Sequence, residues 1–207
     1  MNTAYNRIAG QSVERLAALS DGVFAIVMTL LILEIHVPAR EAISSEQDLL
    51  RALAGLAPHF VVYGMSFLTL GIFWVGQQTQ LSHLARSDRH CTWIHIAFLC
   101  AVSVMPFSTN LLAEFHDYRT ALVTYWLNIL LGGVALYGAW AYAARAGLVK
   151  AEAGADVTRG VKLRIVIAQA LYAAGALLCL VHPHWSIAAI VLVQLNYAIA
   201  PGFRHKP

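Results

Sequence analysis

Arg15, Ser20 and Asp21 form a charged and polar group at the head of an otherwise apolar stretch. From Val23 to Leu33 the only polar residue is Thr29. An ionisable side chain in a membrane-length helix is unfavourable without partners, and it usually serves a function. These side chains can form ion pairs, exchange hydrogen bonds or attract a cation. The chemistry they offer is therefore binding and charge compensation.

Motifs of catalytic chemistry are missing from the sequence. It contains no recognisable nucleophile–base pair, no Gly-rich phosphate loop and no H-E-x-x-H motif. His182 and His184 flank Pro183, but two imidazoles without a third ligand beside them make a poor metal site, so a turn is favoured. We therefore predict neither an enzyme nor a metal centre.

Helical geometry divides the apolar stretch into two sides. At about 100° per residue, Ile26, Leu30 and Leu33 fall within about 40° of one line. Thr29 lies about 60° to the side of Ile26, and Asp21 lies about 140° away from it. On geometry alone, packing against lipid or neighbouring helices is the favoured explanation of the aliphatic line. Asp21 needs a partner from another helix or another subunit.

A second apolar segment supplies candidate partners for Asp21. If this segment runs back across the membrane, Trp74, Gln77 and Gln78 reach the depth of Asp21, and their N–H groups can donate to a carboxylate. A structural network joining the two helices and an interfacial belt of amphipathic side chains are equally good interpretations. The predicted network consists of Arg15, Ser20, Asp21, Trp74, Gln77 and Gln78.

The composition indicates an integral membrane protein. The 207 residues are 59% hydrophobic and 12% charged, whereas soluble domains have roughly 45–50% apolar and about 25% charged residues. A net charge of +3 is too small to indicate a nucleic-acid partner, so the expected surroundings are the lipid bilayer. The Lys and Arg residues are better interpreted as topology signals.

Six apolar segments can be drawn, each close to the length that crosses a hydrocarbon core of about 30 Å. We predict an all-α membrane protein with one six-helix transmembrane domain over residues 1–207. The predicted helices are 15–37, 53–80, 91–113, 119–144, 161–181 and 185–201. Pro106 should kink the third of them, because proline cannot donate the backbone hydrogen bond of a helix interior.

The distribution of positive charge predicts the orientation. Of the 14 Lys and Arg residues, eleven fall before or near the first segment, in the second and fourth connections, or in the C-terminal tail. The first and third connections hold only three. Positive residues collect on the cytoplasmic side of membrane proteins, so both termini are predicted to be cytoplasmic.

The head of the first segment resembles the signature of a known family. The pattern Arg-x-x-x-Leu-Ser-Asp ending at Asp21, followed by an apolar run through Ile35, is similar to the first helix of the transmembrane protein 175 (TMEM175) family of potassium channels. The family pattern has Phe where this chain has Leu19, and it often has His where Gln77 and Gln78 stand. Supporting similarity lies in Tyr63, Ser66, Phe67, Phe73 and Trp74, and in Pro106, Phe107, Ser108 and Thr109.

The resemblance implies a potassium-selective leak channel that assembles as a homotetramer in the cell membrane. Its permeant ion would be K+, and it would need no cofactor and no TVGYG filter. Four copies of the first helix would line the pore. Ile26 would form the narrowest hydrophobic constriction, with Leu30 and Leu33 as the next rings toward the outside. Thr29, just behind these rings, would be the candidate residue whose hydroxyl influences ion selectivity.

Other functions compete with a potassium channel. A proton-permeable cation channel would share the same pore. A small secondary transporter would place ionisable residues near the membrane midplane, but the acidic residues within the segments, Asp21 and Glu34, both lie toward helix ends. A membrane-embedded enzyme would need His residues and carboxylates clustered at one depth, and the sequence shows no such cluster.

Overall fold

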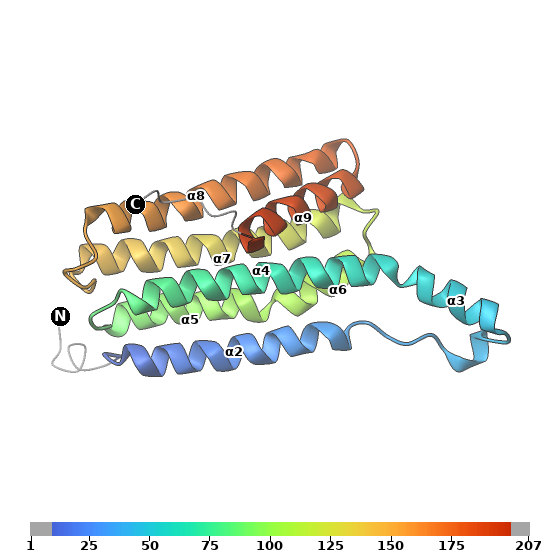
Figure 1. Cartoon of the computed structure of the whole chain (residues 1–207), viewed down its shortest axis with the longest axis horizontal. Helices are drawn as coiled ribbons and strands as arrows, with labels where there is room; N and C mark the ends of the chain where they lie inside the picture. The colour runs from blue at the N-terminus through green and yellow to red at the C-terminus, as the bar shows by residue number, and fades with distance from the viewer. Residues whose placement is uncertain (1–9, 200–207) are drawn as a thin grey trace.

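The computed structural model describes residues 10–199, and these residues fold into helices joined by short connections. The long helices run side by side and form an elongated bundle (Figure 1). The all-α prediction is therefore confirmed. The helices are α2 (Val13–Leu33), α3 (Glu46–Gly55), α4 (Ala57–Ser82), α5 (Arg89–Ser103), α6 (Met105–Glu114), α7 (Arg119–Arg145), α8 (Ala155–Leu177) and α9 (Pro183–Ile199), with 3-10 turns η1 (Arg40–Ala42) and η2 (Leu178–Leu180).

Five helical stretches of the described chain are long and apolar enough to cross a membrane. They are Val13–Leu33, Glu46–Ser82, Arg89–Glu114, Arg119–Arg145 and Ala155–Leu180. The predicted sixth segment corresponds to α9, whose 17 residues reach about 26 Å at 1.5 Å per residue. Its predicted last two residues, 200 and 201, lie outside the described part of the chain.

Two of the predicted helices are divided in the structure. The third predicted segment is interrupted at Val104, where α5 ends and α6 begins with Pro106 in its first turn, as proline's missing N–H requires. The second predicted segment was drawn four residues too early. Residues 53–55 belong to α3, and α4 begins at Ala57 with a proline in its first turn. Helix α3 extends beyond the end of the bundle (Figure 1).

Side-chain caps fix where α2 and α5 begin. Ser12 caps α2 by accepting a hydrogen bond from the Arg15 N–H at 3.2 Å. Asp88 caps α5 by accepting one from the Cys91 N–H at 2.8 Å. Such caps satisfy N–H groups that have no partner within the helix. Asp88 also accepts a hydrogen bond from the Tyr142 hydroxyl at 2.8 Å, which joins the start of α5 to the end of α7.

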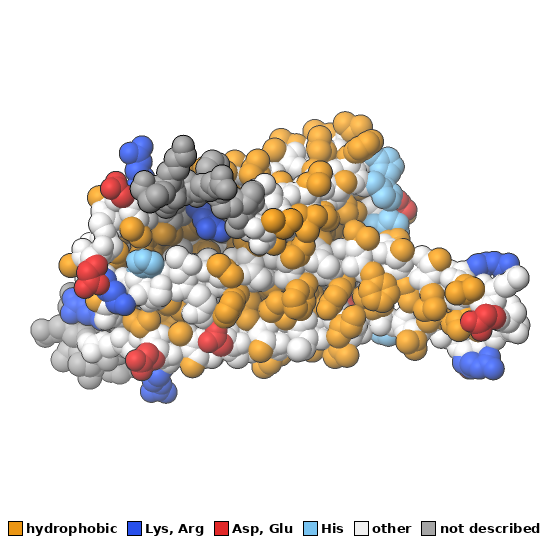
Figure 2. Space-filling model, in the orientation of Figure 1, with side chains coloured by type: hydrophobic (Ala, Val, Ile, Leu, Met, Phe, Trp, Pro, Cys, Tyr) orange, Lys and Arg blue, Asp and Glu red, His pale blue; other side chains and the backbone are white. Residues whose placement is uncertain are grey.

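Helix α2 lies at one edge of the bundle. It packs against α4, α5 and α6, and α8 and α9 lie on the opposite side (Figure 1). Phe24, Val27 and Leu31 of α2 are buried in the main apolar core. Hydrophobic side chains cover the middle of the bundle, and most charged side chains on the visible face lie toward its two ends (Figure 2). This distribution fits a bilayer around the middle of the bundle.

Candidate functional site

The two sides of α2 have opposite environments. One side is buried, and its residues recur at helical spacing: Leu16, Ser20, Phe24, Val27 and Leu31. The other side carries an exposed aliphatic line, which consists of Leu19, Ile26, Leu30 and Leu33 and is 49%, 61%, 41% and 67% exposed. Intrachain packing leaves this line uncovered, so lipid, a pore or another subunit must cover it.

Asp21 is held by two donors from α4. Its Oδ1 accepts hydrogen bonds from Trp74 Nε1 at 2.8 Å and from Gln78 Nε2 at 2.7 Å. Trp74 and Gln78 lie four residues apart, so they share one face of α4. We call Asp21, Trp74 and Gln78 the Asp21 cluster. Two charge-assisted hydrogen bonds compensate the carboxylate and fix the rotation of α2 against α4.

The structure leaves the other three residues of the predicted network out of this cluster. Ser20 is buried and donates to the Leu16 carbonyl of its own helix at 2.9 Å. Gln77 is also buried, and its Nε2 donates to His95 Nδ1 of α5 at 3.3 Å. Within residues 10–199 the exposed Arg15 side chain forms no hydrogen bond or ion pair. The prediction was wrong for Gln77 because adjacent helical residues point about 100° apart and cannot both face α2.

Thr29 is exposed beside the aliphatic line, and its hydroxyl is occupied within its own helix. The hydroxyl lies 2.9 Å from the Ala25 carbonyl and 2.8 Å from the Ile26 carbonyl. Because both partners are carbonyls, the Thr29 hydroxyl donates its proton inward. Its lone pairs remain free to accept a hydrogen bond from water or to contact a cation.

Glu34 has a partner that sequence reasoning missed. Asn110 Nδ2 of α6 donates to Glu34 Oε2, close to the C-terminal end of α2. Asn110 stands as an amide inside a predicted apolar segment, and this could have marked it as a candidate partner. The end of α2 is thereby attached to α6, as its beginning is attached to α4.

A buried polar network, also absent from the predictions, joins the helices behind α2. Tyr125 of α7 bonds through its hydroxyl to Ser66 and Thr69 of α4, both at 3.2 Å. Thr109 of α6 donates to Ser66 at 2.7 Å, and Gln194 of α9 donates to Thr69 at 2.6 Å. Buried hydroxyls and amides are stable when they bond to one another. The network fixes α4, α6, α7 and α9 as a frame against which α2 packs.

Comparisons with known proteins point to one family. Residues 15–106 match the family model described as endosomal/lysosomal potassium channel TMEM175. A protein of Streptomyces collinus named as a potassium channel is 32% identical over 198 residues, which is 93% of each chain. A Gallus gallus protein named endosomal/lysosomal proton channel TMEM175 is 34% identical over 111 residues, or 51% of this chain and 22% of that protein.

A solved structure has the same fold. The crystal structure of a lysosomal potassium-selective channel TMEM175 homolog from Chamaesiphon minutus superposes with a TM-score of 0.80 at 26% identity. The superposition covers 91% of this chain and 97% of that one. Similarity over nearly the full length, in sequence and in structure, shows that the chain belongs to the TMEM175 family.

Proposed function

We propose that the chain is a potassium-selective leak channel of the cell membrane, in which four subunits surround a pore lined by α2. The observation that carries this proposal is the exposed aliphatic line on an edge helix whose other sides are attached to α4, α5 and α6. A lipid-facing helix also exposes aliphatic residues. The family relation favours a pore, since relatives are named as potassium channels.

In this proposal Ile26 forms the narrowest ring of the pore. Four isoleucine side chains around an axis exclude water and offer an ion no ligands in its place, so conduction requires a small dilation of the ring. Leu30 and Leu33 form the next rings toward the outside. Gly22 lies one turn before Ile26, and a Cβ there would meet nothing within 4 Å in the single chain, so the neighbouring subunits can approach closely.

Selectivity follows from dehydration at this ring. Potassium loses its water shell more easily than sodium, so a tight apolar ring favours potassium. The outward lone pairs of Thr29 would partly replace the lost water. Asp21 plays a structural part in this proposal, because its carboxylate points to Trp74 and Gln78 of its own subunit.

A flux assay tests the pore. Purified protein in liposomes should pass potassium down its gradient, faster than a carrier cycle and without coupled protons or ATP, with sodium and caesium as comparison ions. Ile26→Asn should increase the flux and reduce the potassium/sodium preference, because an amide hydrates the ring. Ile32→Asn is the matched control, since Ile32 is also exposed (43%) but lies about 120° from Ile26. Equal effects of both substitutions would contradict a pore along the aliphatic line.

Proton permeation is the second candidate function, favoured by the name of the Gallus gallus relative. It would use the same pore, so the same liposomes with an internal pH indicator measure it. Acidification that follows an imposed potential in the absence of permeant metal ions, and that Ile26→Asn changes, would support it. Potassium flux that needs no counter-ion would contradict a coupled transporter.

A further inference from the structure

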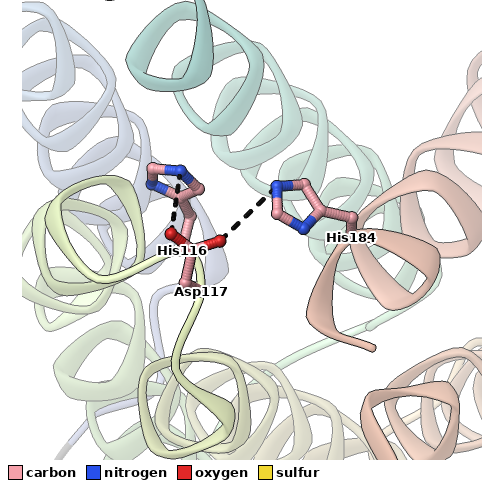
Figure 3. A group of neighbouring side chains, drawn as sticks. All are labelled: His116, Asp117 and His184. Carbon is pink, nitrogen blue, oxygen red and sulfur yellow. Dashed lines mark ion pairs between the residues drawn. The ribbon is translucent and has the colours of Figure 1, made fainter. Parts of the chain in front are cut away.

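Three metal-ligating side chains meet at the end of the bundle that also carries the α6–α7 connection. His116 and Asp117 belong to that connection, and His184 lies in the first turn of α9. Figure 3 shows the two imidazoles on either side of the carboxylate. His116 Nε2 lies 3.7 Å from Asp117 Oδ2, and His184 Nε2 lies 3.8 Å from Asp117 Oδ1. We call these three residues the histidine cluster.

Hydrogen bonds on the far side of each ring determine which ring nitrogen carries the proton. His116 Nδ1 lies 3.2 Å from the Ala113 carbonyl, and a carbonyl can only accept, so Nδ1 carries the proton. His182 Nδ1 accepts from the His184 backbone N–H at 3.4 Å. His184 Nδ1, 3.0 Å from the same atom, is therefore the donor. In the neutral form of each ring, Nε2 is therefore the nitrogen without a proton.

Two imidazole lone pairs and a carboxylate thus face one another. At 3.7 and 3.8 Å neither nitrogen is within hydrogen-bond distance of the carboxylate. A bound cation would satisfy all three groups at once. Ligands of a tetrahedral zinc ion lie about 2.0–2.2 Å from the metal, and therefore about 3.3 Å from one another. One ligand atom of each residue lies within 4.8 Å of the other two, so small side-chain rotations close the site.

We propose that His116, Asp117 and His184 bind a divalent transition-metal ion such as zinc. Imidazole ligands favour zinc, nickel or copper over magnesium or calcium, which prefer oxygen. Each ring is also oriented by a hydrogen bond from its other nitrogen, which is the usual arrangement around a metal-bound histidine. The side chains of His116, Asp117 and His184 are 28%, 65% and 55% exposed, so an ion can enter from solvent and a water can complete the coordination.

The site is separate from α2. It lies beside a place where the start of α7 already contacts η2. Arg119 Nη2 at the start of α7 donates to the Leu180 carbonyl of η2 at 3.0 Å. A bound ion would add a link between the α6–α7 connection and the start of α9. We expect the ion to stabilise the α7–α9 side of the bundle without blocking the pore. The sequence drew attention only to His182 and His184, because the other two proposed ligands, His116 and Asp117, come from a distant part of the chain.

Calorimetric titration of zinc into the untagged, chelator-treated full chain in detergent tests the proposal. We expect one zinc ion per chain. His116→Ala, His184→Ala and the isosteric Asp117→Asn should each weaken binding by at least about 100-fold, because even the outer partners of metal ligands contribute about 10–100-fold. His36→Ala, an exposed histidine of another connection, is the matched control and should bind zinc like the parent.

A second measurement separates metal binding from folding defects. Zinc should raise the thermal unfolding temperature of the parent and of His36→Ala, and should leave that of the three cluster variants unchanged. Absence of saturable zinc binding in the parent would overturn the proposal. Zinc binding that survives His116→Ala and is lost in His182→Ala would also overturn it, because the ion would then belong to the turn alone.

Discussion

The hydrogen bond between Trp74 and Asp21 should contribute measurably to stability. Trp74→Phe keeps the aromatic packing and removes the N–H that lies 2.8 Å from Asp21 Oδ1. A hydrogen bond to a charged group contributes about 1.5–3 kcal/mol. Gln78 still donates to the same oxygen at 2.7 Å, and Asp21 is exposed in the subunit. We therefore expect a contribution below the middle of that range, about 1–2 kcal/mol.

A double-mutant cycle measures this contribution. The free energy of unfolding is determined by reversible titration with SDS in mixed micelles for the parent, Asp21→Ala, Trp74→Phe and the double variant. The coupling energy should be about 1–2 kcal/mol. Trp126→Phe is the matched control, because Trp126 Nε1 is buried without a hydrogen-bond partner in the described chain, and its coupling to Asp21 should be close to zero.

Two outcomes would contradict this role of the Asp21 cluster. A coupling energy between Asp21 and Trp74 within the additivity error of about 0.3–0.5 kcal/mol would show that the hydrogen bond does not hold α2 against α4. Intact Trp74→Phe assemblies with an altered potassium/sodium preference would show that the Asp21 cluster acts on the ion path. Unchanged selectivity together with reduced stability is the expected result.

Two further substitutions test the pore and the core. Thr29→Ala should lower the potassium/sodium permeability ratio measured from reversal potentials, and an unchanged ratio would remove Thr29 from selectivity. Gly132→Ala should destabilise the chain by about 1–3 kcal/mol through overpacking, because its Cβ would lie 2.9 Å from the Phe73 ring. In the same unfolding assay Gly138→Ala should stay within about 1 kcal/mol of the parent, since a Cβ there meets nothing within 4 Å. Equal losses would contradict the packing argument.

Features that depend on local sequence were predictable. The apolar segments, a distortion at Pro106 and the two sides of α2 follow from hydrophobicity, proline chemistry and helical spacing. A kink in one helix was predicted, whereas the structure ends α5 and begins α6 at Val104. The division between α3 and α4 was missed, because apolar residues lie on both sides of it, although Gly55 ends α3 and Pro58 lies in the first turn of α4. The motif ending at Asp21 was specific enough to indicate the family.

Contacts between helices could be predicted only in part. The partners of Asp21 came from the correct helix, because antiparallel neighbours bring Trp74 and Gln78 to its depth. Gln77 was assigned to the wrong partner, since sequence position gives depth but not the rotation of α4 about its axis. The network around Tyr125 joins residues as far as 125 positions apart, and no local sequence pattern predicts it.

The sequence by itself determined the membrane class, the family and the aliphatic line of α2, because each depends on composition or on spacing within one helix. Only the tertiary structure decided that Gln78 and not Gln77 bonds to Asp21, and that His116 and Asp117 meet His184. The physical reason is the same in both cases. A side chain's partner depends on the rotation and packing of two separate elements, and the whole core sets these together.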